Sequence, residues 1–408
     1  MDRKLKQYAE LIVKQGANLQ KGEMVAIASP VMAAELAEAI AEEAYKNGAS
    51  QVMTLWSDAK IGKLAYQYES LETLTNIPAH VVAARDYILE NKGVYICLLS
   101  EIPGLLKDVD PVLVGERSKA SGKALMRFRE STGINKTRWC LAAYPNKYWA
   151  KQMFPDLNED EALDKQWEYV HKTLRLDEED YLAAWKQHQE NLARRSKFLN
   201  DAKIKTFHYK NSIGTDFTIG MPKGYMFTGA VEKSLDGLDF TANLPTEEVF
   251  SSPDKNTAEG TLVSALPLVR NGVIIENFSI TFEKGRIVDY KAEKGYETLK
   301  QIIETDEGSH YLGEIAIIGY NSPIQNLKAL FYETLFDENA SCHFAIGRAF
   351  PACLENGVNM SKDELAAAGL NDSLQHVDFM VGTADLSITA TTESGEEITV
   401  FVDGNWVI

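Results

Sequence analysis

The first third of the chain alternates between helical patterns and short apolar runs, and no other feature restricts its possible folds as strongly. A helical pattern over residues 2–15 leads into the apolar run Glu23–Ser29, and an Ala/Glu-rich pattern over 33–47 leads into the run Gln51–Trp56. Such alternation predicts parallel strands joined by helices, and a short continuous apolar run is typical of a strand buried on both faces. Because the alternation continues to about residue 145, we predict an α/β domain with a parallel sheet. Its further elements are expected at residues 78–91 (helix), 94–99 (strand), 112–130 (helix) and 137–143 (strand).

The second half of the chain has a different pattern, in which strand-like runs follow one another with turns between them. Residues 156–201 are almost continuously helical in pattern, and we interpret them as a bridge between domains. Turn sequences at 283–286 and 394–397 indicate hairpins, so we predict an α+β domain with a large, mostly antiparallel sheet. The expected domains are residues 1–190, a lid or dimerisation scaffold whose helical bridge begins at about 156, and residues 191–408, which carry the site.

Composition, charge and missing motifs exclude several classes of function. The chain has 42 Lys and Arg against 59 Asp and Glu, a net charge of −17, so we expect no nucleic-acid partner. No apolar run reaches the roughly 18 residues of a membrane span, and the N-terminus lacks a signal-peptide pattern, so we expect no membrane partner and a cytoplasmic location. No glycine-rich phosphate-binding motif follows the strands of the first domain, and none of the four cysteines has CxxC spacing, which favours buried thiols.

Two ionisable residues two positions apart mark the most distinctive candidate site. His376 and Asp378 lie in the run His376–Val381, which predicts a strand, so their side chains share one face of it. Burying an ionisable group without a partner costs roughly several kcal/mol of folding free energy. This pair therefore needs a partner. A metal ion is one possible partner. A simple hydrogen bond between the imidazole and the carboxylate is the alternative, and this motif alone favours it slightly over a metal.

Further candidates lie in the same half of the chain, each beside apolar sequence. His343 follows an acidic segment that includes Glu338, and Glu314 is embedded in a strongly apolar strand just after a glycine. Glu247 and Glu248 point in opposite directions if their segment is extended, so only one of them enters a site. A solvated charge remains the alternative for each of these glutamates.

Two histidines and several carboxylates in one domain form a ligand mix that suits zinc, cobalt or manganese better than calcium. The number of carboxylates exceeds that of a closed structural zinc site and fits a two-metal hydrolytic site with a bridging carboxylate. No GxSxG motif and no cysteine with a supporting nucleophile signature offers a competing chemistry.

Four segments of the chain resemble, in the same order, those of the M29 family of thermophilic metalloaminopeptidases, and the resemblance extends over essentially the whole chain. The segments are residues 243–250, 312–316, 337–347 and 376–382. The resemblance implies a cytoplasmic homodimer that releases N-terminal amino acids from short peptides through a water activated by two divalent metal ions (Zn, Co, Mn or Mg). By position, the implied metal ligands are Glu248, Glu314 as the bridge, Glu338 as a sixth ligand, His343, His376 and Asp378. Glu314 or Glu248 is the implied catalytic base, and Glu247 faces away.

One position departs from the family pattern. Many family members carry a tyrosine that has been considered catalytic where this chain has Phe350. The phenyl ring cannot stabilise an oxyanion, so this member is expected to be slower, to differ in preference, or to use another group. Two alternative functions therefore remain open: another metallohydrolase on the same ligands, such as a phosphoesterase, and a catalytically silent peptide-binding relative. A site crowded with carboxylates also favours substrates whose first residue is neutral or basic.

Overall fold

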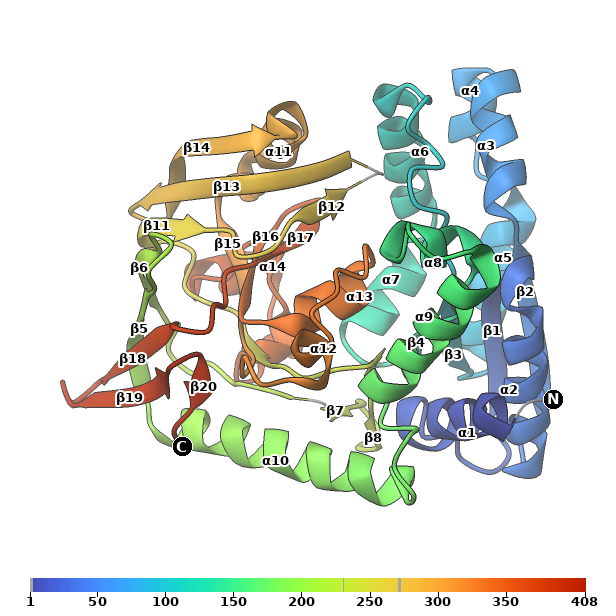
Figure 1. The fold of residues 1–408 in the computed structure, drawn as a ribbon, viewed down its shortest axis with the longest axis horizontal. Coiled ribbons are helices and arrows are strands. Elements are labelled where there is room, and N and C mark those ends of the chain that lie inside the picture. Colours follow the sequence, from blue (N-terminus) through green and yellow to red (C-terminus); the bar gives the residue numbers. More distant parts are fainter. Residues whose placement is uncertain (1–2, 230, 271–272) are drawn as a thin grey trace. The chain divides into compact units, whose positions relative to one another are not determined.

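The computed structural model describes residues 3–229, 231–270 and 273–408 (Figure 1). The chain divides into two compact units, the first comprising residues 1–184 and 231–245 and the second comprising residues 185–230 and 246–408. This division differs from the single boundary expected after residue 190, because a short segment of the second half returns to the first unit. Within the described ranges, no helix combines the length and the hydrophobicity that a membrane crossing requires.

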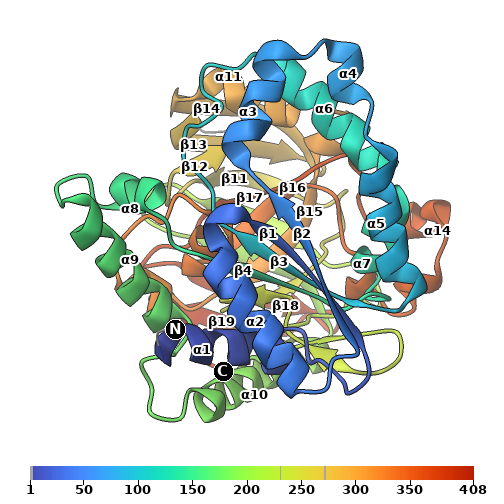
Figure 2. The ribbon, with the colours of Figure 1, turned by 90° about the vertical axis from the view of Figure 1, so that its right-hand side faces the viewer.

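The first unit is built on a parallel sheet, as the alternation predicts. Its strands lie in the order β2-β1-β3-β4-β9, and each neighbouring pair is parallel. The bounds are β1 Met24–Pro30, β2 Gln51–Ser57, β3 Val94–Leu99, β4 Trp139–Ala143 and β9 Asn243–Leu244. Helices cover both faces of β1: α2 packs against one side (Figure 2), whereas Met24 and Ala26 pack with α5 and α7. This two-sided burial is the reason for the continuous apolar run in β1.

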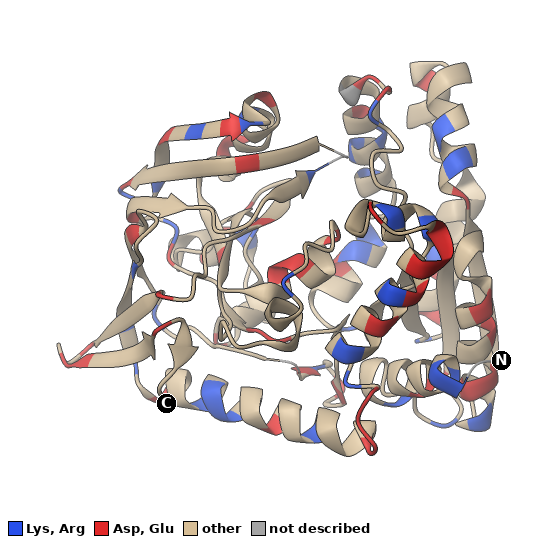
Figure 3. Ribbon diagram, viewed as in Figure 1, with Lys and Arg blue, Asp and Glu red and all other residues tan. Residues whose placement is uncertain are grey.

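The helices expected in this unit are present, two of them interrupted, and α3, α4 and α8 are additional to the expected ones. They are α1 Arg3–Leu11, α2 Ala34–Lys46, α3 Ala59–Tyr68, α4 Leu71–Thr75, α5 Ala79–Glu90, α6 Pro111–Ala124, α7 Met126–Gly133, α8 Lys147–Met153 and α9 Glu159–Thr173, followed by α10 Tyr181–Asp201, which continues into the second unit. The helix expected at 112–130 is divided at Leu125 into α6 and α7. The expected bridge is two helices, and α9 begins with an acidic first turn that complements its dipole (Figure 3).

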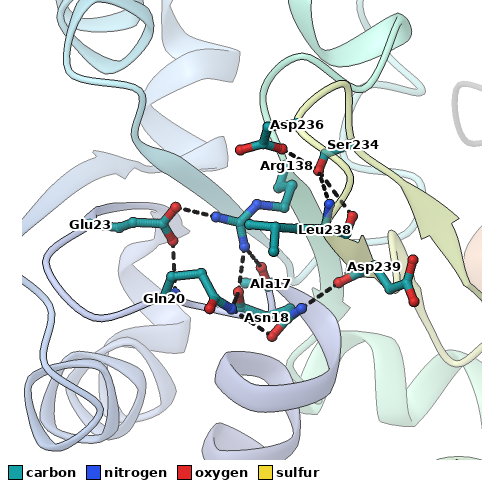
Figure 4. Close-up of polar contacts among 9 residues, drawn as sticks. All are labelled: Ala17, Asn18, Gln20, Glu23, Arg138, Ser234, Asp236, Leu238 and Asp239. Atoms are coloured by element: carbon teal, nitrogen blue, oxygen red, sulfur yellow. Dashed lines mark hydrogen bonds and ion pairs between the residues drawn. The ribbon is translucent and has the colours of Figure 1, made fainter.

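A buried arginine helps to hold residues 231–245 in the first unit (Figure 4). The Arg138 side chain is 4% exposed, pairs with Glu23 and donates to the carbonyl of Asn18. Asn18 in turn donates to the carbonyl of Asp239 at 2.5 Å. Together with the pairing of β9 with β4, these contacts explain why a segment from the second half of the sequence belongs to the parallel sheet.

The second unit contains two sheets, one large and mostly antiparallel as expected and one smaller. The large sheet has the strand order β12-β13-β11-β6-β5-β18-β19-β20, with β14 paired to β13, and the smaller has the order β10-β15-β16-β17. The hairpins expected at 283–286 and 394–397 join β13 to β14 and β18 to β19. The strands of the large sheet are β5 Ile204–Lys210, β6 Asp216–Gly220, β11 Glu259–Val263, β12 Leu268–Arg270, β13 Val273–Glu283, β14 Arg286–Lys294, β18 Ser387–Thr392, β19 Glu397–Val402 and β20 Asn405–Trp406. Those of the smaller sheet are β10 Val249–Ser251, β15 Leu312–Ile317, β16 His343–Gly347 and β17 His376–Met380; the helices are α11 Tyr296–Ile303, α12 Pro323–Asn326, α13 Thr334–Asp337 and α14 Lys362–Ala367.

Aromatic side chains join the two sheets of the second unit. The ring of Phe344 on β16 lies 5.1 Å from that of Tyr209 on β5 and 5.3 Å from that of Phe217 on β6. Alternate residues of the smaller sheet, including Ile315 and Phe379, extend this apolar core. One face of the smaller sheet is therefore committed to the core, and its other face is available for a site.

Candidate metal centre

The second face of the smaller sheet carries most of the residues that the sequence singled out. The antiparallel register places Glu314 of β15 opposite Ala345 of β16, and Ala345 opposite Asp378 of β17. Side chains alternate along a strand, so His343 and His376 lie on this same face. The small side chain of Ala345 therefore lies between the two acidic residues.

A register irregularity places Glu314 within this face. The pairing of β15 with β16 shifts between Leu312 and Glu314, at Gly313. A Cβ atom on Gly313 would lie 2.3 Å from the carbonyl oxygen of Gly347 and 2.4 Å from that of Arg348. Only glycine therefore permits this close approach of the two strands, which is the structural reason for the glycine before the embedded carboxylate.

Four short distances join the carboxylates and imidazoles. Nε2 of His343 lies 3.3 Å from Oε2 of Glu248 and 3.9 Å from Oε1 of Glu314. Nε2 of His376 lies 2.8 Å from Oε2 of Glu314 and 3.2 Å from Oδ1 of Asp378. Glu248, Glu314 and His343 are buried, whereas the side chain of His376 is 23% exposed. Solvent therefore reaches this cluster of side chains at His376 but not at Glu248.

Backbone carbonyls orient both imidazoles. Nδ1 of His376 lies 2.7 Å from the carbonyl oxygen of Arg348, and Nδ1 of His343 lies 3.3 Å from that of Ser341. A carbonyl oxygen only accepts, so each Nδ1 carries the proton. Nε2 of each imidazole faces a carboxylate, to which it donates a hydrogen bond when protonated, and the same nitrogen would offer its lone pair to a metal ion when the proton is lost.

The carboxylates of the site repel one another, and this repulsion helps to raise the pKa values of Glu314 and Glu338. Burial raises the pKa of Glu314, and the charges of Asp378 and Glu248 add to this rise against the hydrogen bond from His376. Loss of solvation and the charges of the same two residues hold the pKa of Glu338 well above its ordinary range. Although burial acts to lower it, the hydrogen bond and charge of Glu248 raise the pKa of His343 to about 10. A cation among these carboxylates would relieve the repulsion, so the donor set fits divalent metal ions.

Among the residues that the structure describes, two groups offer ligand atoms within 4.8 Å of one another: Glu248, Glu314 and His343, and Glu314, His376 and Asp378. Glu314 belongs to both groups. The hydrogen-bond alternative for His376 and Asp378 is therefore only part of the arrangement, because Glu314 approaches the same imidazole more closely. Carboxylate and imidazole donors of this kind suit zinc, cobalt or manganese.

Among the described residues, neither Glu338, the implied sixth ligand, nor Glu247 belongs to the two groups of ligand atoms. Glu338 lies in the turn after α13, and its pKa responds to the charges of the other site residues. Glu247 points away from the site, with its Oε2 3.7 Å from Nε2 of His188. His188, interpreted as a surface or hydrogen-bonded residue, is buried and donates to the carbonyl of Thr246 at 2.8 Å.

Phe350 lies beside the site. Its ring centroid is 4.8 Å from that of His376 and 5.8 Å from that of Phe250. The side chain is half-buried. The departure from the family pattern therefore concerns a residue in contact with the site.

Two residues with a role at the site were not found by sequence reasoning. The carbonyl of Arg348 orients His376, but a backbone carbonyl leaves no trace in side-chain identity. Asn339 contacts the segments that carry Glu247 and Glu338. Its position next to an acidic candidate was the sole available signal.

A separate cavity of about 760 Å³ lies in the first unit, lined by residues that include Glu35, Tyr144 and Trp167, and no candidate ligand lines it.

The chain is similar to known proteins over almost its whole length. The family model described as thermophilic metalloprotease (M29) matches residues 1–406. The chain is 39% identical to Aminopeptidase 2 of Geobacillus stearothermophilus and 41% identical to Aminopeptidase AmpS of Bacillus subtilis, in each case over 99% of this chain and 98% of the relative. The solved structure of wild-type AmpT from Thermus thermophilus matches with a TM-score of 0.92 and 31% identity, over 100% of this chain and 99% of that one. A dioxygenase structure from Pseudomonas putida matches with a TM-score of 0.52 at 15% identity, over 99% and 96% of the two chains, which shows a shared fold alone.

Proposed function

Because the chain belongs to the M29 family of thermophilic metalloproteases, it is a peptide hydrolase, and we propose that it is an aminopeptidase that releases N-terminal residues from short peptides. Relatives named as aminopeptidases match over nearly their full length and support this activity. The observation that carries the proposal is the position of Glu314, whose two oxygens face the two histidines of the site. A carboxylate in that position suits a pair of metal ions better than a single one.

We assign two divalent ions to the two groups that share Glu314. Glu248 and His343 complete the first group, and His376 and Asp378 complete the second. Glu338 is the additional acidic ligand. When bound, the ions supply Lewis acidity toward the peptide carbonyl and lower the pKa of water toward neutrality.

The protein's own residues then provide proton transfer and orientation. Glu248 or Glu314 accepts the proton of the attacking water, because both carboxylates belong to the ligand groups and a positioned carboxylate can act as a general base. The carbonyls of Arg348 and Ser341 hold the imidazoles in the tautomer that leaves Nε2 free. The carboxylates of the site can accept hydrogen bonds from the α-amine of a peptide, which an internal peptide nitrogen cannot replace, and this favours cleavage at the N-terminus.

The resemblance supplies three further parts of this proposal. The protein acts in the cytoplasm, it forms a homodimer, and its first domain serves as the lid or dimerisation scaffold for the catalytic domain. The physiological metal is zinc, cobalt, manganese or magnesium.

The test is removal and return of metal. The purified protein is treated with EDTA, and hydrolysis of Leu-, Arg- and Asp-p-nitroanilides is measured before and after addition of Co²⁺, Zn²⁺, Mn²⁺ or Mg²⁺. We expect EDTA to abolish release of the first residue and at least one of these ions to restore it. Activity that survives complete removal of metal contradicts the proposal. p-Nitrophenyl phosphate is the control substrate, since its metal-dependent hydrolysis without peptidase activity would support a phosphoesterase instead.

A further inference from the structure

The candidate ligands of the second unit are positioned in two different ways. Glu314, His343, His376 and Asp378 lie on strands of one sheet, so the ladder of backbone hydrogen bonds sets their spacing. Glu248 directly precedes β10, and Glu338 lies in a short turn after α13. These two glutamates therefore need another means of being held near the strand residues, against the repulsion between carboxylates.

Asn339 joins the two segments that carry them. This residue is 0% exposed, and both the oxygen and the nitrogen of its side-chain amide form hydrogen bonds. Oδ1 accepts a hydrogen bond from the backbone N–H of Glu247 at 2.8 Å. Nδ2 donates to the carbonyl of Leu335 at 3.0 Å and to Oε1 of Glu338 at 3.5 Å.

The orientation of this amide is determined by its neighbours. A backbone N–H only donates, so the amide oxygen of Asn339 must face Glu247. The NH₂ group is thereby directed at the carbonyl oxygen of Leu335 and at the carboxylate of Glu338, and both of these groups accept hydrogen bonds. No other standard side chain of this size presents an acceptor and a two-hydrogen donor in one plane.

We propose that Asn339 is a positioning residue of the metal centre, which holds Glu248 and Glu338 at the spacing that metal binding requires. The inference rests on the proposed function, because it presumes that these glutamates are ligands. The bond to the Glu247 N–H fixes the backbone one peptide before Glu248. The Nδ2 group also faces the carboxylate of Glu338, at a longer distance of 3.5 Å. Residues that orient metal ligands in this way typically change metal affinity about 10–100-fold when they are substituted.

The test is Co²⁺ binding by the full-length protein after removal of metal. Affinity is measured by calorimetry, and the visible absorption of bound Co²⁺ reports the coordination geometry. The variants are Asn339→Ala, which loses all three bonds, and Asn339→Asp, which keeps an acceptor for the N–H of Glu247 but lacks the donor to Glu338. The matched control is Asn200→Ala, because Asn200 of α10 likewise exchanges two hydrogen bonds with the backbone of Phe227, at 2.6 and 2.9 Å.

We expect Asn339→Ala to weaken Co²⁺ binding by about 10–100-fold and to change the absorption spectrum, with a smaller loss in Asn339→Asp. Asn200→Ala is expected to bind Co²⁺ as the wild type does, even if its unfolding midpoint falls. Wild-type affinity and spectrum in an Asn339 variant that folds would overturn the inference. Equal losses of affinity in Asn339→Ala and Asn200→Ala would also overturn it, since that result indicates general destabilisation.

Glu314→Gln separates this inference from the proposed function. If Glu314→Gln binds Co²⁺ as tightly as the wild type, the proposed metal centre itself fails. If Glu314→Gln loses tight binding while Asn339→Ala retains it, only the role of Asn339 fails. Far-ultraviolet circular dichroism of each metal-free variant identifies those that have folded.

Discussion

Oε2 of Glu314 lies 2.8 Å from Nε2 of His376. The other oxygen of the same carboxylate faces a second histidine, 3.9 Å from Nε2 of His343. One side chain therefore contacts two imidazoles on different strands, and the proposed bridging role of Glu314 rests on this position. The predictions below follow from this arrangement and from the backbone that supports it.

Removal of the acidic charge of Glu248 or of Glu314 should abolish most of the activity. We expect Glu248→Gln and Glu314→Gln to lower kcat/KM for Leu-p-nitroanilide by roughly 10²–10⁴-fold, because each change removes a ligand charge and a candidate base. The matched control is Glu247→Gln, adjacent in sequence but directed at His188. The prediction is wrong if both site variants retain metal and full turnover.

The close approach of β15 and β16 predicts that Gly313 tolerates no side chain. Gly313→Ala should lower the free energy of unfolding by about 2 kcal/mol or more, because its methyl group would meet two backbone oxygens at 2.3 and 2.4 Å. Activity should fall as well, since Glu314 must move. Urea unfolding measures the loss. Gly115→Ala in α6 is the control, because a Cβ at that glycine meets nothing within 4 Å; an equal loss in the two variants would contradict the explanation.

Phe350→Tyr should raise turnover. The ring already contacts His376, so a hydroxyl group on it adds a hydrogen-bond donor beside the site. We expect kcat to rise by at most roughly 10²-fold, the lower end of the effect of a preorganised oxyanion donor, with little change in KM. Steady-state kinetics of the two proteins with the same metal check this. An unchanged or lower kcat would indicate that another group already fills this role.

The negative charge of the chain predicts a preference among substrates. Two divalent ions balance the four acidic candidates Glu248, Glu314, Glu338 and Asp378, but the chain carries a net charge of −17, so its field repels an acidic first residue. We expect kcat/KM for Asp-p-nitroanilide to be about tenfold or more below the values for the Leu and Arg substrates. Added salt should reduce the difference, because it screens the repulsion. Comparable turnover of all three substrates would count against this electrostatic explanation.

Asp306 predicts a pH-dependent contribution to stability away from the site. Although burial acts to raise it, hydrogen bonds from the N–H groups of Leu374 (2.6 Å) and Ser309 (2.8 Å) and from the Ser373 hydroxyl lower the pKa of Asp306 below its ordinary 3.8. A lowered pKa in the folded state means that the stabilisation is complete above the unfolded pKa and is lost as the pH falls through the folded value. Asp306→Asn should therefore cost about 1–2 kcal/mol at pH 7 and progressively less below about pH 4. Urea unfolding of both proteins from pH 7 to pH 3 measures this difference, and a difference that does not change with pH would rule out the carboxylate as its source.

Local patterns in the sequence were sufficient for much of the fold and for the choice of candidate residues. Alternation of helices and apolar runs predicted the parallel sheet, and two-residue spacing predicted that His376 and Asp378 share a face. The same rule predicted that Glu247 and Glu248 diverge. Each of these conclusions depends on backbone periodicity, which neighbouring residues determine by themselves.

Longer-range features were decided only by the tertiary structure. The segment His343–Gly347 is too short for its apolar pattern to distinguish a strand from a helix, and it becomes a strand through pairing with β15 and β17 on both sides. The return of residues 231–245 to the parallel sheet depends on contacts with β4 and Asn18, distant in sequence.

The amino-acid sequence by itself determined which residues carry ligand chemistry and which face of each strand they occupy. The tertiary structure decided the distances between them, because the register of three strands and the irregularity at Gly313 bring Glu314 between two histidines. It also placed Asn339 between the two glutamates outside the sheet. Spacing of this kind arises from pairing between distant segments, and no local pattern specifies it.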